Sequence, residues 1–439
     1  MSITERQNLK GARSPDAPGV IKDQSLPRGL FADYQCRSCL KQDLELVVDL
    51  GFQPLANSFL TRESLTRMEP TYPLTMLYCT HCHLAQVPAV AKAHDIFSEY
   101  LYLSSFSQTW LDHARVFVDQ VVNRFGLGPR SRVIEIASND GYLLQFVIEK
   151  GIPALGIEPA ANAAKLAEQK GIPTRVAFFG KETARTLRAE GWTADVAVAN
   201  NVLAHVPDLN DFVSGFEVIL SKEGVASFEF PHLANLIASA QFDTIYHEHF
   251  SYIALSAATK FFRRHSLRVF DVEKLPTHGG SLRLYVCREN AGHSRSPSVD
   301  DVLGEEESAG LDRSDTYRGF AQECFRIKND LLKFLIAAHE NSKLVCGYGA
   351  PAKGNTLLNY CGVGTDLLAF TVDRNPHKQN HFLPGTRIPI LPPEDISARK
   401  PDYVLILPWN LKSEISEQMI HIRDWGGKFV VAVPQLNVF

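Results

Sequence analysis

Short apolar runs alternate with longer stretches of helical periodicity through the middle of the chain. The runs are rich in β-branched residues, and they are predicted to be buried strands at 133–137, 154–158, 174–176, 194–199 and 224–229. Helical periods separate these strands, and a further helix is predicted at 110–125. This alternation predicts a doubly wound parallel sheet between about residues 129 and 286.

The same pattern returns near the end of the chain. A long amphipathic helix is predicted at 316–341, and a strand, a glycine loop and a helix follow over 343–356, with a second strand at 370–373. The expected fold class is therefore α/β, with a Rossmann-like middle domain and a second Rossmann-like domain at the C-terminus. The polar and acidic stretch 289–315 is predicted to be a linker of low order.

Composition and charge narrow the class of protein. The 439 residues exceed what one core usually holds, and 45% hydrophobic with 21% charged residues is typical of a globular protein. A net charge of −4 gives no electrostatic reason to expect nucleic acid or an anionic membrane as a partner. The polar N-terminus lacks the apolar core of a signal peptide, and no apolar run is long enough for a membrane span, so we expect a cytoplasmic protein.

Four of the eight cysteines form two CxxC pairs in the N-terminal part of the chain. A CxxC turn brings two thiolates close enough to share one tetrahedral ion, so the pairs predict a zinc site made by Cys36, Cys39, Cys79 and Cys82. Four sulfur ligands leave no open coordination position, and the expected role of the Zn²⁺ is therefore structural. The alternative is a set of buried or redox-active cysteines.

The segment RVIEIASNDGY, residues 132–142, joins the first strand of the sheet to a glycine turn and a helix. Such a turn places backbone N–H groups and acids at the carboxyl edge of the sheet, and the second strand ends in an acid where ribose hydroxyls bind. Because the loop lacks GxGxxG, the pattern favours S-adenosyl-L-methionine over a dinucleotide. The residues expected to bind it are Glu135, Ser138, Asn139, Asp140, Gly141, Glu158, Pro159 and Asn200. The alternative is an ordinary βαβ unit with surface acids.

The densest group of titratable side chains is YHEHF, residues 246–250. Its two histidines are two positions apart and HExxH spacing is absent, so a metal site is disfavoured. A histidine of near-neutral pKa beside a carboxylate suits proton abstraction, and Glu248 is expected to orient such a ring or raise its basicity.

Other polar side chains follow the ends of predicted strands and are candidates for substrate contact. Asn201 and His205 follow the fourth strand, at the edge where ligands bind in such sheets. His278 belongs to a THGG segment whose glycines would let backbone approach a ligand; the alternative is a plain strand turn.

Two further candidates lie outside the central sheet. GYGAPAKGN is not a Walker A loop, since glycine follows its lysine, but its N–H groups and Lys353 would suit a diphosphate, with Asn355 beside them. Tyr100 and Tyr102 would form a pocket wall, or alternatively pack between the small N-terminal module and the next domain.

Together, the CxxC pairs, EIASNDGY, GIEP, NNVLAHV, YHEHFSY, THGGSLR and GYGAPAKGN resemble the motifs of sugar C-methyltransferases that act on nucleotide-linked 4-keto deoxysugars. The resemblance implies a zinc-bearing N-terminal module, a class I methyltransferase domain and a C-terminal domain that helps anchor a nucleotide sugar, for which a dTDP-linked sugar is expected. It also implies that His249 is the base and that Glu248, Tyr246 and His205 share its site.

The implied reaction is removal of an α-proton by His249 to give an enolate, followed by methyl transfer, with His205, Tyr246 or Asn201 as donor to the enolate oxygen. The alternatives are an O- or N-methyltransferase for a small metabolite, or a non-catalytic nucleotide-sugar-binding protein. A monomer or a dimer is expected. The predicted parts are a disordered tail at 1–29, a zinc-binding module at 30–92, the methyltransferase domain at 93–288, the linker at 289–315 and the nucleotide-sugar-binding domain at 316–439.

Overall fold

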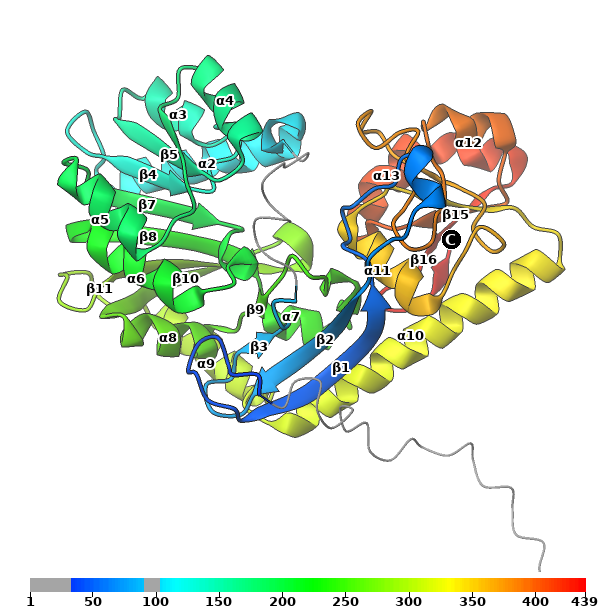
Figure 1. Ribbon diagram of the computed structural model, residues 1–439, viewed down its shortest axis with the longest axis horizontal. Coiled ribbons are helices and arrows are strands. Elements are labelled where there is room, and N and C mark those ends of the chain that lie inside the picture. Colours follow the sequence, from blue (N-terminus) through cyan, green and yellow to red (C-terminus); the bar gives the residue numbers. More distant parts are fainter. Residues whose placement is uncertain (1–32, 91–102) are drawn as a thin grey trace, which may run out of the picture. The chain divides into compact units, whose positions relative to one another are not determined.

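The structure is a computed structural model that describes residues 33–90 and 103–439 (Figure 1). Every helix and strand described below lies in the unit Gln35–Phe439. The tail predicted at 1–29 lies outside the described residues.

The first sheet is small and entirely antiparallel, with strand order β1-β2-β3-β9. Its strands are β1 (Leu44–Gln53), β2 (Tyr72–Cys79), β3 (Ala85–Gln86) and β9 (Ser251–Tyr252), with the short helix η1 (Glu63–Thr66) between β1 and β2. The fourth strand comes from a distant part of the chain, directly after YHEHF. The cysteine module and the YHEHF segment are thus joined through one sheet.

The second sheet has seven strands in the order β10-β11-β8-β7-β4-β5-β6. They are β4 (Val133–Ile136), β5 (Ala154–Glu158), β6 (Thr174–Val176), β7 (Ala194–Asn200), β8 (Leu220–Pro231), β10 (Leu267–Leu275) and β11 (Ser281–Arg288). The five predicted strands are all present and mutually parallel, while β11 runs antiparallel to both of its neighbours. The sequence did not indicate the β10–β11 pair.

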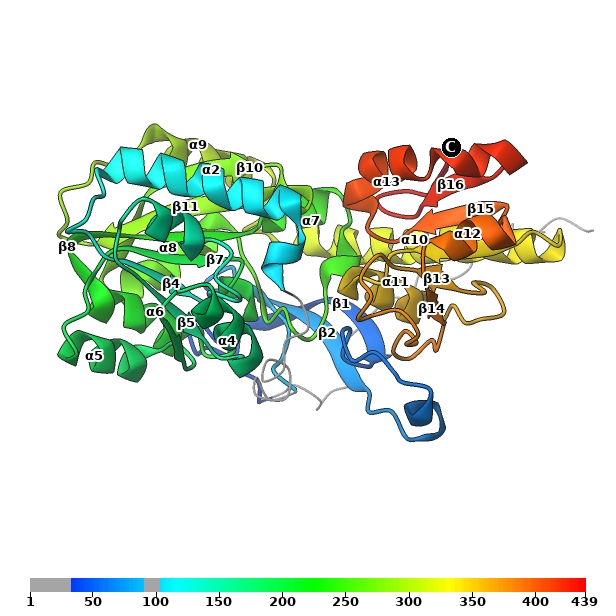
Figure 2. The ribbon, with the colours of Figure 1, turned by 90° about the horizontal axis from the view of Figure 1, so that it is seen from above.

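Alternate side chains of the central strands enter two different cores, as a doubly wound sheet requires. Val196 and Val198 pack with α2 and α3, whereas Ala197 and Ala199 pack with α5, α6 and α8. The helices are α2 (Gln108–Phe125), α3 (Leu144–Glu149), α4 (Ala161–Gln169), α5 (Lys181–Ala189), α6 (Leu209–Ile219), α7 (Leu233–Ala238) and α8 (Leu255–Arg264). Helices α2 and α5 lie on opposite sides of the sheet (Figure 2).

The C-terminal part begins with the long helix α10 (Ser314–Glu340), which runs beside β1 (Figure 1). A six-stranded sheet follows, in the order β14-β13-β12-β15-β16-β17, with only β17 antiparallel. Its elements are β12 (Val345–Tyr348), α11 (Ala352–Cys361), β13 (Thr371–Val372), β14 (Ile390–Leu391), α12 (Glu394–Arg399), β15 (Tyr403–Ile406), α13 (Lys412–Gln418), β16 (Lys428–Val431) and β17 (Asn437–Val438). The predicted second Rossmann-like sheet is confirmed.

The stretch 289–315 is ordered, so the prediction of low order is wrong. It contains α9 (Pro297–Ser308), which Ser296 caps by accepting a hydrogen bond from the N–H of Ser298. The acidic composition gave a wrong prediction because one of its acids, Glu306, is buried. The Glu306 carboxylate accepts hydrogen bonds from the backbone N–H groups of Leu255 at 2.6 Å and Ser256 at 2.8 Å. This carboxylate caps the start of α8 from a distant part of the chain.

Candidate active site

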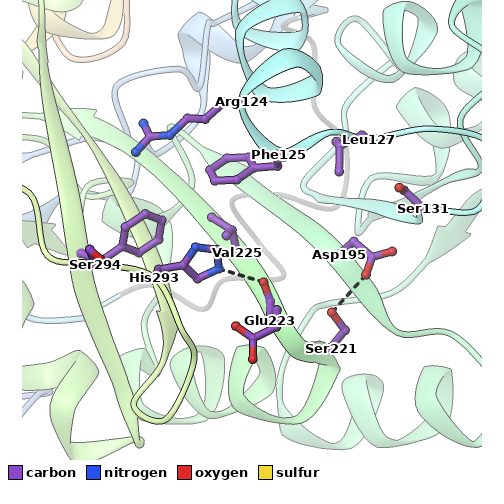
Figure 3. Close-up of a pocket in the computed structure, with 11 residues that line it drawn as sticks. Arg124, Phe125, Leu127, Ser131, Asp195, Ser221, Glu223, Val225, His293 and Ser294 are labelled. Carbon is purple, nitrogen blue, oxygen red and sulfur yellow. Dashed lines mark hydrogen bonds between the residues drawn. The ribbon is translucent and has the colours of Figure 1, made fainter.

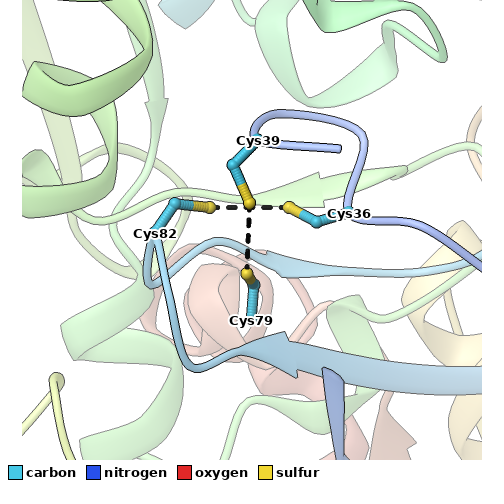
Figure 4. Close-up of side chains that lie close together, drawn as sticks. All are labelled: Cys36, Cys39, Cys79 and Cys82. Carbon is cyan, nitrogen blue, oxygen red and sulfur yellow. Dashed lines mark hydrogen bonds between the residues drawn. The ribbon is translucent and has the colours of Figure 1, made fainter. Parts of the chain in front are cut away.

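The four cysteines of the two CxxC pairs converge on one point (Figure 4). The Sγ atoms of Cys36 and Cys82 are 3.5 Å apart and those of Cys39 and Cys79 are 3.6 Å apart, and all four lie within 4.8 Å of one another. Zn–S bonds of about 2.3 Å in a tetrahedron separate sulfurs by about 3.8 Å, so the arrangement fits Zn²⁺ with no open position. The zinc is structural.

The loop after β4 adopts the left-handed conformation at every second residue. Ala137, Asn139 and Gly141 have φ values of 53°, 50° and 77°. At Gly141 a Cβ would overlap the side chain of Ile172, so only glycine fits there. Backbone that alternates in this way curls around its own N–H groups and forms a concave site.

Three acids surround this loop. Glu158 accepts from the backbone N–H groups of Asn139 and Ala160, both at 2.8 Å, which ties the end of β5 to the loop. Glu135 is fully buried, and its Oε2 has no hydrogen-bond partner among the described residues. Burial, together with the charges of Glu158 and Asp140, raises the pKa of Glu135 well above its ordinary value. An acidic, concave site with an unused buried carboxyl oxygen suits S-adenosyl-L-methionine, which carries a sulfonium and an ammonium group.

The other predicted cofactor residues lie at the same edge of the sheet. Ser138 is buried beside Gly156, Pro159 directly follows β5, and Asn200 ends β7 with its Oδ1 accepting from Ser227 Oγ at 3.3 Å. Asp140 binds Lys170 Nζ at 3.1 Å and also accepts from Ser105.

The ring of His249 is fixed at both nitrogens. Nδ1 lies 3.1 Å from the Thr244 carbonyl, to which it donates, and Nε2 lies 2.8 Å from the Tyr246 hydroxyl, which donates to it. Burial first, and then the neighbouring His205, lower the pKa of His249 well below its ordinary value. The ring is therefore neutral near pH 7, with Nε2 as its basic atom.

His205 stands edge-on to His249, with ring centroids 4.7 Å apart. Its Nδ1 donates to the Glu248 carbonyl at 2.9 Å, and burial lowers the pKa of His205 to about 4. A neutral ring that donates through Nδ1 has only an acceptor at Nε2. His205 is thus not the donor to an enolate oxygen that the sequence suggested.

The Glu248 side chain turns away from His249, so the predicted pairing of this carboxylate with the ring is wrong. Both carboxylate oxygens accept from Asn57 Nδ2, at 2.8 and 2.9 Å, and burial raises the pKa of Glu248 to about 7. Residues 247 and 248 form a turn, closed by the His249 N–H donating to the Tyr246 carbonyl at 2.9 Å, and the Glu248 and His249 side chains diverge there. Thr244, not Glu248, orients the His249 ring.

His278 and Lys353 lie near the two histidines. His278 has a left-handed φ of 55° and lies 5.4 Å from Trp110 between ring centroids. Burial and then the Lys353 ammonium lower the pKa of His278 to about 4. Asn201, also left-handed at φ 58°, has a buried Nδ2 with no partner among the described residues.

The remaining residues predicted to contact the substrate are Asn355, Tyr100 and Tyr102. The Asn355 Nδ2 donates to the Ala56 carbonyl at 2.6 Å, so its amide group links α11 to the zinc module and its predicted substrate contact is not supported. Tyr100 and Tyr102 lie outside the described residues. Sequence reasoning missed Asn57, Thr244 and Trp110, because they act on the site through contacts far along the chain or through backbone.

A hollow of about 580 Å³ lies elsewhere, at the amino edge of the central sheet (Figure 3). Ser131, Asp195 and Ser221 line it where β4, β7 and β8 begin, together with Arg124 and His293. The loop after β4 and the histidines follow the opposite, carboxyl ends of these strands, so the hollow is separate from the candidate active site.

The fold and these sites define an S-adenosyl-L-methionine-dependent methyltransferase with a structural zinc module. Models of three families match the chain: a zinc binding domain over residues 36–97, a methyltransferase domain over 110–271 and the C-methyltransferase C-terminal domain over 276–434. The chain is 35% identical over 404 residues to the C-methyltransferase NovU of Streptomyces niveus, covering 92% of this chain and 96% of that protein. It therefore belongs to the C-methyltransferase family that includes NovU.

Solved structures align with part of the chain. Magnesium protoporphyrin IX methyltransferase from Synechocystis, with bound S-adenosylmethionine, is 14% identical, covering 46% of this chain and 99% of that one, with a TM-score of 0.34. A methyltransferase from Anabaena variabilis is 13% identical over 39% of this chain and 83% of its own, with a TM-score of 0.33. Across residues 33–90 and 103–439, no helix combines the length and apolar character needed to cross a bilayer.

Proposed function

We propose that this C-methyltransferase acts on a nucleotide-linked 4-keto sugar and that His249 is its general base. The observation that carries the proposal is the fixed tautomer of His249, which leaves Nε2 basic and directed at the Tyr246 hydroxyl 2.8 Å away. The motifs shared with sugar C-methyltransferases and the second Rossmann-like domain support a nucleotide-sugar substrate, and a dTDP-linked sugar is the first to test.

The proposed reaction begins with proton transfer. His249 Nε2 takes the proton from the carbon next to the ketone, the C–H electron pair forms a C=C bond, and the carbonyl π pair moves to oxygen. The neutral donors proposed for that oxygen are the Asn201 amide and the Tyr246 hydroxyl, which gives up its hydrogen bond to Nε2 when that atom takes the proton. The enolate carbon then takes the methyl group, the S–C electron pair stays with sulfur, and the carbonyl re-forms.

S-adenosyl-L-methionine, when bound, supplies the electrophilic methyl group. We assign its binding to the loop after β4 and to the acids around it, comprising Glu135, Ser138, Asn139, Asp140, Gly141, Glu158, Pro159 and Asn200. Glu158 is placed to accept from ribose hydroxyls, because each of its oxygens keeps one acceptor site beside its backbone bond. Alignment of carbon and methyl group is expected to supply most of the acceleration.

The test is exchange of the substrate α-hydrogen in deuterated water, followed by mass spectrometry on a panel of 4-keto nucleotide sugars. The wild-type enzyme is expected to exchange the hydrogen and to add one methyl group, and His249→Asn to lose both. His247→Asn is the matched control, because the His247 Nε2 is directed at the Pro73 carbonyl, 3.3 Å away in the zinc module. Normal exchange by His249→Asn would remove His249 as the base.

An O- or N-methyltransferase would not exchange a carbon-bound hydrogen, so the same experiment separates those alternatives. Membership of the C-methyltransferase family already disfavours them and the non-catalytic alternative.

A further inference from the structure

Lys353 is the second residue of α11, in the loop whose sequence suggested a diphosphate site. We propose that Lys353 is instead a further catalytic residue, whose ammonium group stabilises the enolate oxygen formed beside His249. The inference rests on the proposed function, because it requires an enolate.

Two backbone N–H groups of the loop already have acceptors within the protein. The Gly349 N–H donates to the Val372 carbonyl at 2.6 Å, and the Ala350 N–H donates to Asp373 Oδ2 at 2.7 Å. Phosphate loops bind through several N–H groups directed at the ligand. Here an intramolecular carboxylate already takes that place, and it would repel a phosphate.

The start of α11 packs directly on the segment that carries the base. Thr356, one turn after Lys353, donates through Oγ1 to the Ile245 carbonyl at 3.0 Å. Ile245 directly follows Thr244, whose carbonyl orients the His249 ring. The helix that presents Lys353 is thus anchored four residues before the general base.

A second contact fixes the ammonium group itself. Lys353 Nζ lies 4.7 Å from the centroid of the Trp409 ring, and the Trp409 Nε1 donates to Asp243 Oδ2 at 2.7 Å. The Trp409 ring also lies close to Gly279, where an added Cβ would be 2.9 Å from its Cη2 atom. Trp409 therefore contacts Lys353, Asp243 of the base segment and the loop that carries His278.

The charge of Lys353 is not neutralised by an ion pair. Its Nζ donates to the neutral Asn410 Oδ1 at 2.8 Å, and within the described residues no carboxylate oxygen lies within 4.0 Å of it. Burial lowers the pKa of Lys353, and its charge in turn contributes to the lowered pKa of both His249 and His278. An ammonium group whose field reaches the base, and which has no carboxylate oxygen within 4.0 Å among the described residues, suits an anion that forms during the reaction.

The chemistry of the step is favoured by such a cation. When His249 takes the α-proton, the carbonyl oxygen passes from neutral to a full negative charge, so a fixed cation stabilises the product of that step more than the ketone. His205 cannot act in this way, because its Nε2 is an acceptor. The neutral donors Tyr246 and Asn201 leave room for one charged group.

The test compares Lys353→Met with the control Lys378→Met, which removes a lysine from the same domain whose Nζ is held by the Ala350 carbonyl at 2.9 Å and lies 3.7 Å from Asp373. Lys353→Met is expected to lower both kcat and the rate of α-hydrogen exchange by about 10²–10³-fold, the usual effect of removing one oxyanion donor, with little change in KM. Lys353→Arg is expected to recover part of the exchange, and Lys378→Met to leave kcat and exchange unchanged. A raised KM with unchanged kcat and exchange would mean diphosphate binding and would overturn the proposal.

A second measurement does not depend on substrate. The histidine pKa values of the free enzyme, followed by NMR in the wild type and in folded Lys353→Met, are expected to rise for His278 and His249 in the variant, because a nearby cation is lost. Unchanged values would overturn the placement of Lys353. If the wild type exchanges no 4-keto sugar, the proposed function fails, whereas normal exchange by Lys353→Met defeats only the inference about this lysine.

Discussion

Replacing Asp243 with asparagine is expected to stabilise the protein, and more at high pH than at low pH. Asp243 has no exposed surface, and burial raises its pKa from an ordinary 3.8 to about 6, although the charge of Lys353 and the bond from Trp409 oppose the rise. A carboxyl group whose pKa is higher in the folded state stabilises the fold only while protonated. That stability is present below pH 3.8 and is lost as the pH rises through 6.

The magnitude follows from these two pKa values. Because folding raises the pKa of Asp243, the free energy of unfolding is lower than with an unshifted carboxyl group, by about 1.5 kcal/mol at pH 5 and about 3 kcal/mol at pH 8. Asp243→Asn removes this cost and keeps an oxygen that accepts from the Trp409 Nε1, so its gain in unfolding free energy should follow the same curve. Urea denaturation of wild type and variant at a series of pH values between 5 and 8, with zinc saturating, measures the difference. A gain that is equal at both ends, or a loss at pH 8, would refute the reasoning.

Three further perturbations have expected outcomes. Cys82→Ser should reduce the zinc content measured by elemental analysis and lower the thermal midpoint, because three thiolates remain; full zinc content with an unchanged midpoint would contradict a structural role. Gly141→Ala should cost about 1–3 kcal/mol of stability and weaken S-adenosyl-L-methionine binding in calorimetry, since the residue has a φ of 77° and its Cβ would overlap Ile172; unchanged affinity would remove the loop from the cofactor site. Asn57→Ala leaves the Glu248 carboxylate without its donor and should raise its pKa further, with a loss of about 1–3 kcal/mol that is larger at pH 9 than at pH 6 in denaturant unfolding; a pH-independent loss would show that Glu248 is not ionised there.

The sequence predicted those parts of the molecule that are determined by residues close together in the chain. The strand at 133–137, the loop after it and the acid at 158 appear where expected, because β-branched runs, left-handed Asn and Gly positions and strand-end acids act within a few residues. The order of all seven strands could not be predicted, since the pairing of β11 with β8 depends on residues 50 or more positions apart. Strand β9 could not be predicted for the same reason, because it has only two residues and is recognisable as a strand only by its pairing with β3.

In the candidate site, the sequence named the residue types correctly but not their partners. YHEHF suggested that Glu248 acts on His249, yet the carboxylate meets Asn57, which is 191 positions away. The 289–315 stretch was mispredicted in the same way, because the Glu306 carboxylate is hydrogen-bonded to His232 Nε2, 2.7 Å away and far along the chain. Buried polar groups form hydrogen bonds with whichever part of the fold lies next to them, and the composition of a segment does not show which part that is.

The segment from Asp243 to Tyr252 explains why a zinc ion without a chemical role is built into the enzyme. This segment holds the proposed base, and three parts of the chain fix it: Asn57 of the zinc module through Glu248, the Ala204 carbonyl of the methyltransferase domain through the Phe250 N–H at 2.7 Å, and α11 through the Ile245 carbonyl. Its last two residues are β9, paired with β3 of the zinc-module sheet. The position of the His249 ring is therefore set by contacts from all three, and zinc on the four cysteines would support it by ordering the turn Cys79–Cys82, which joins β2 to β3.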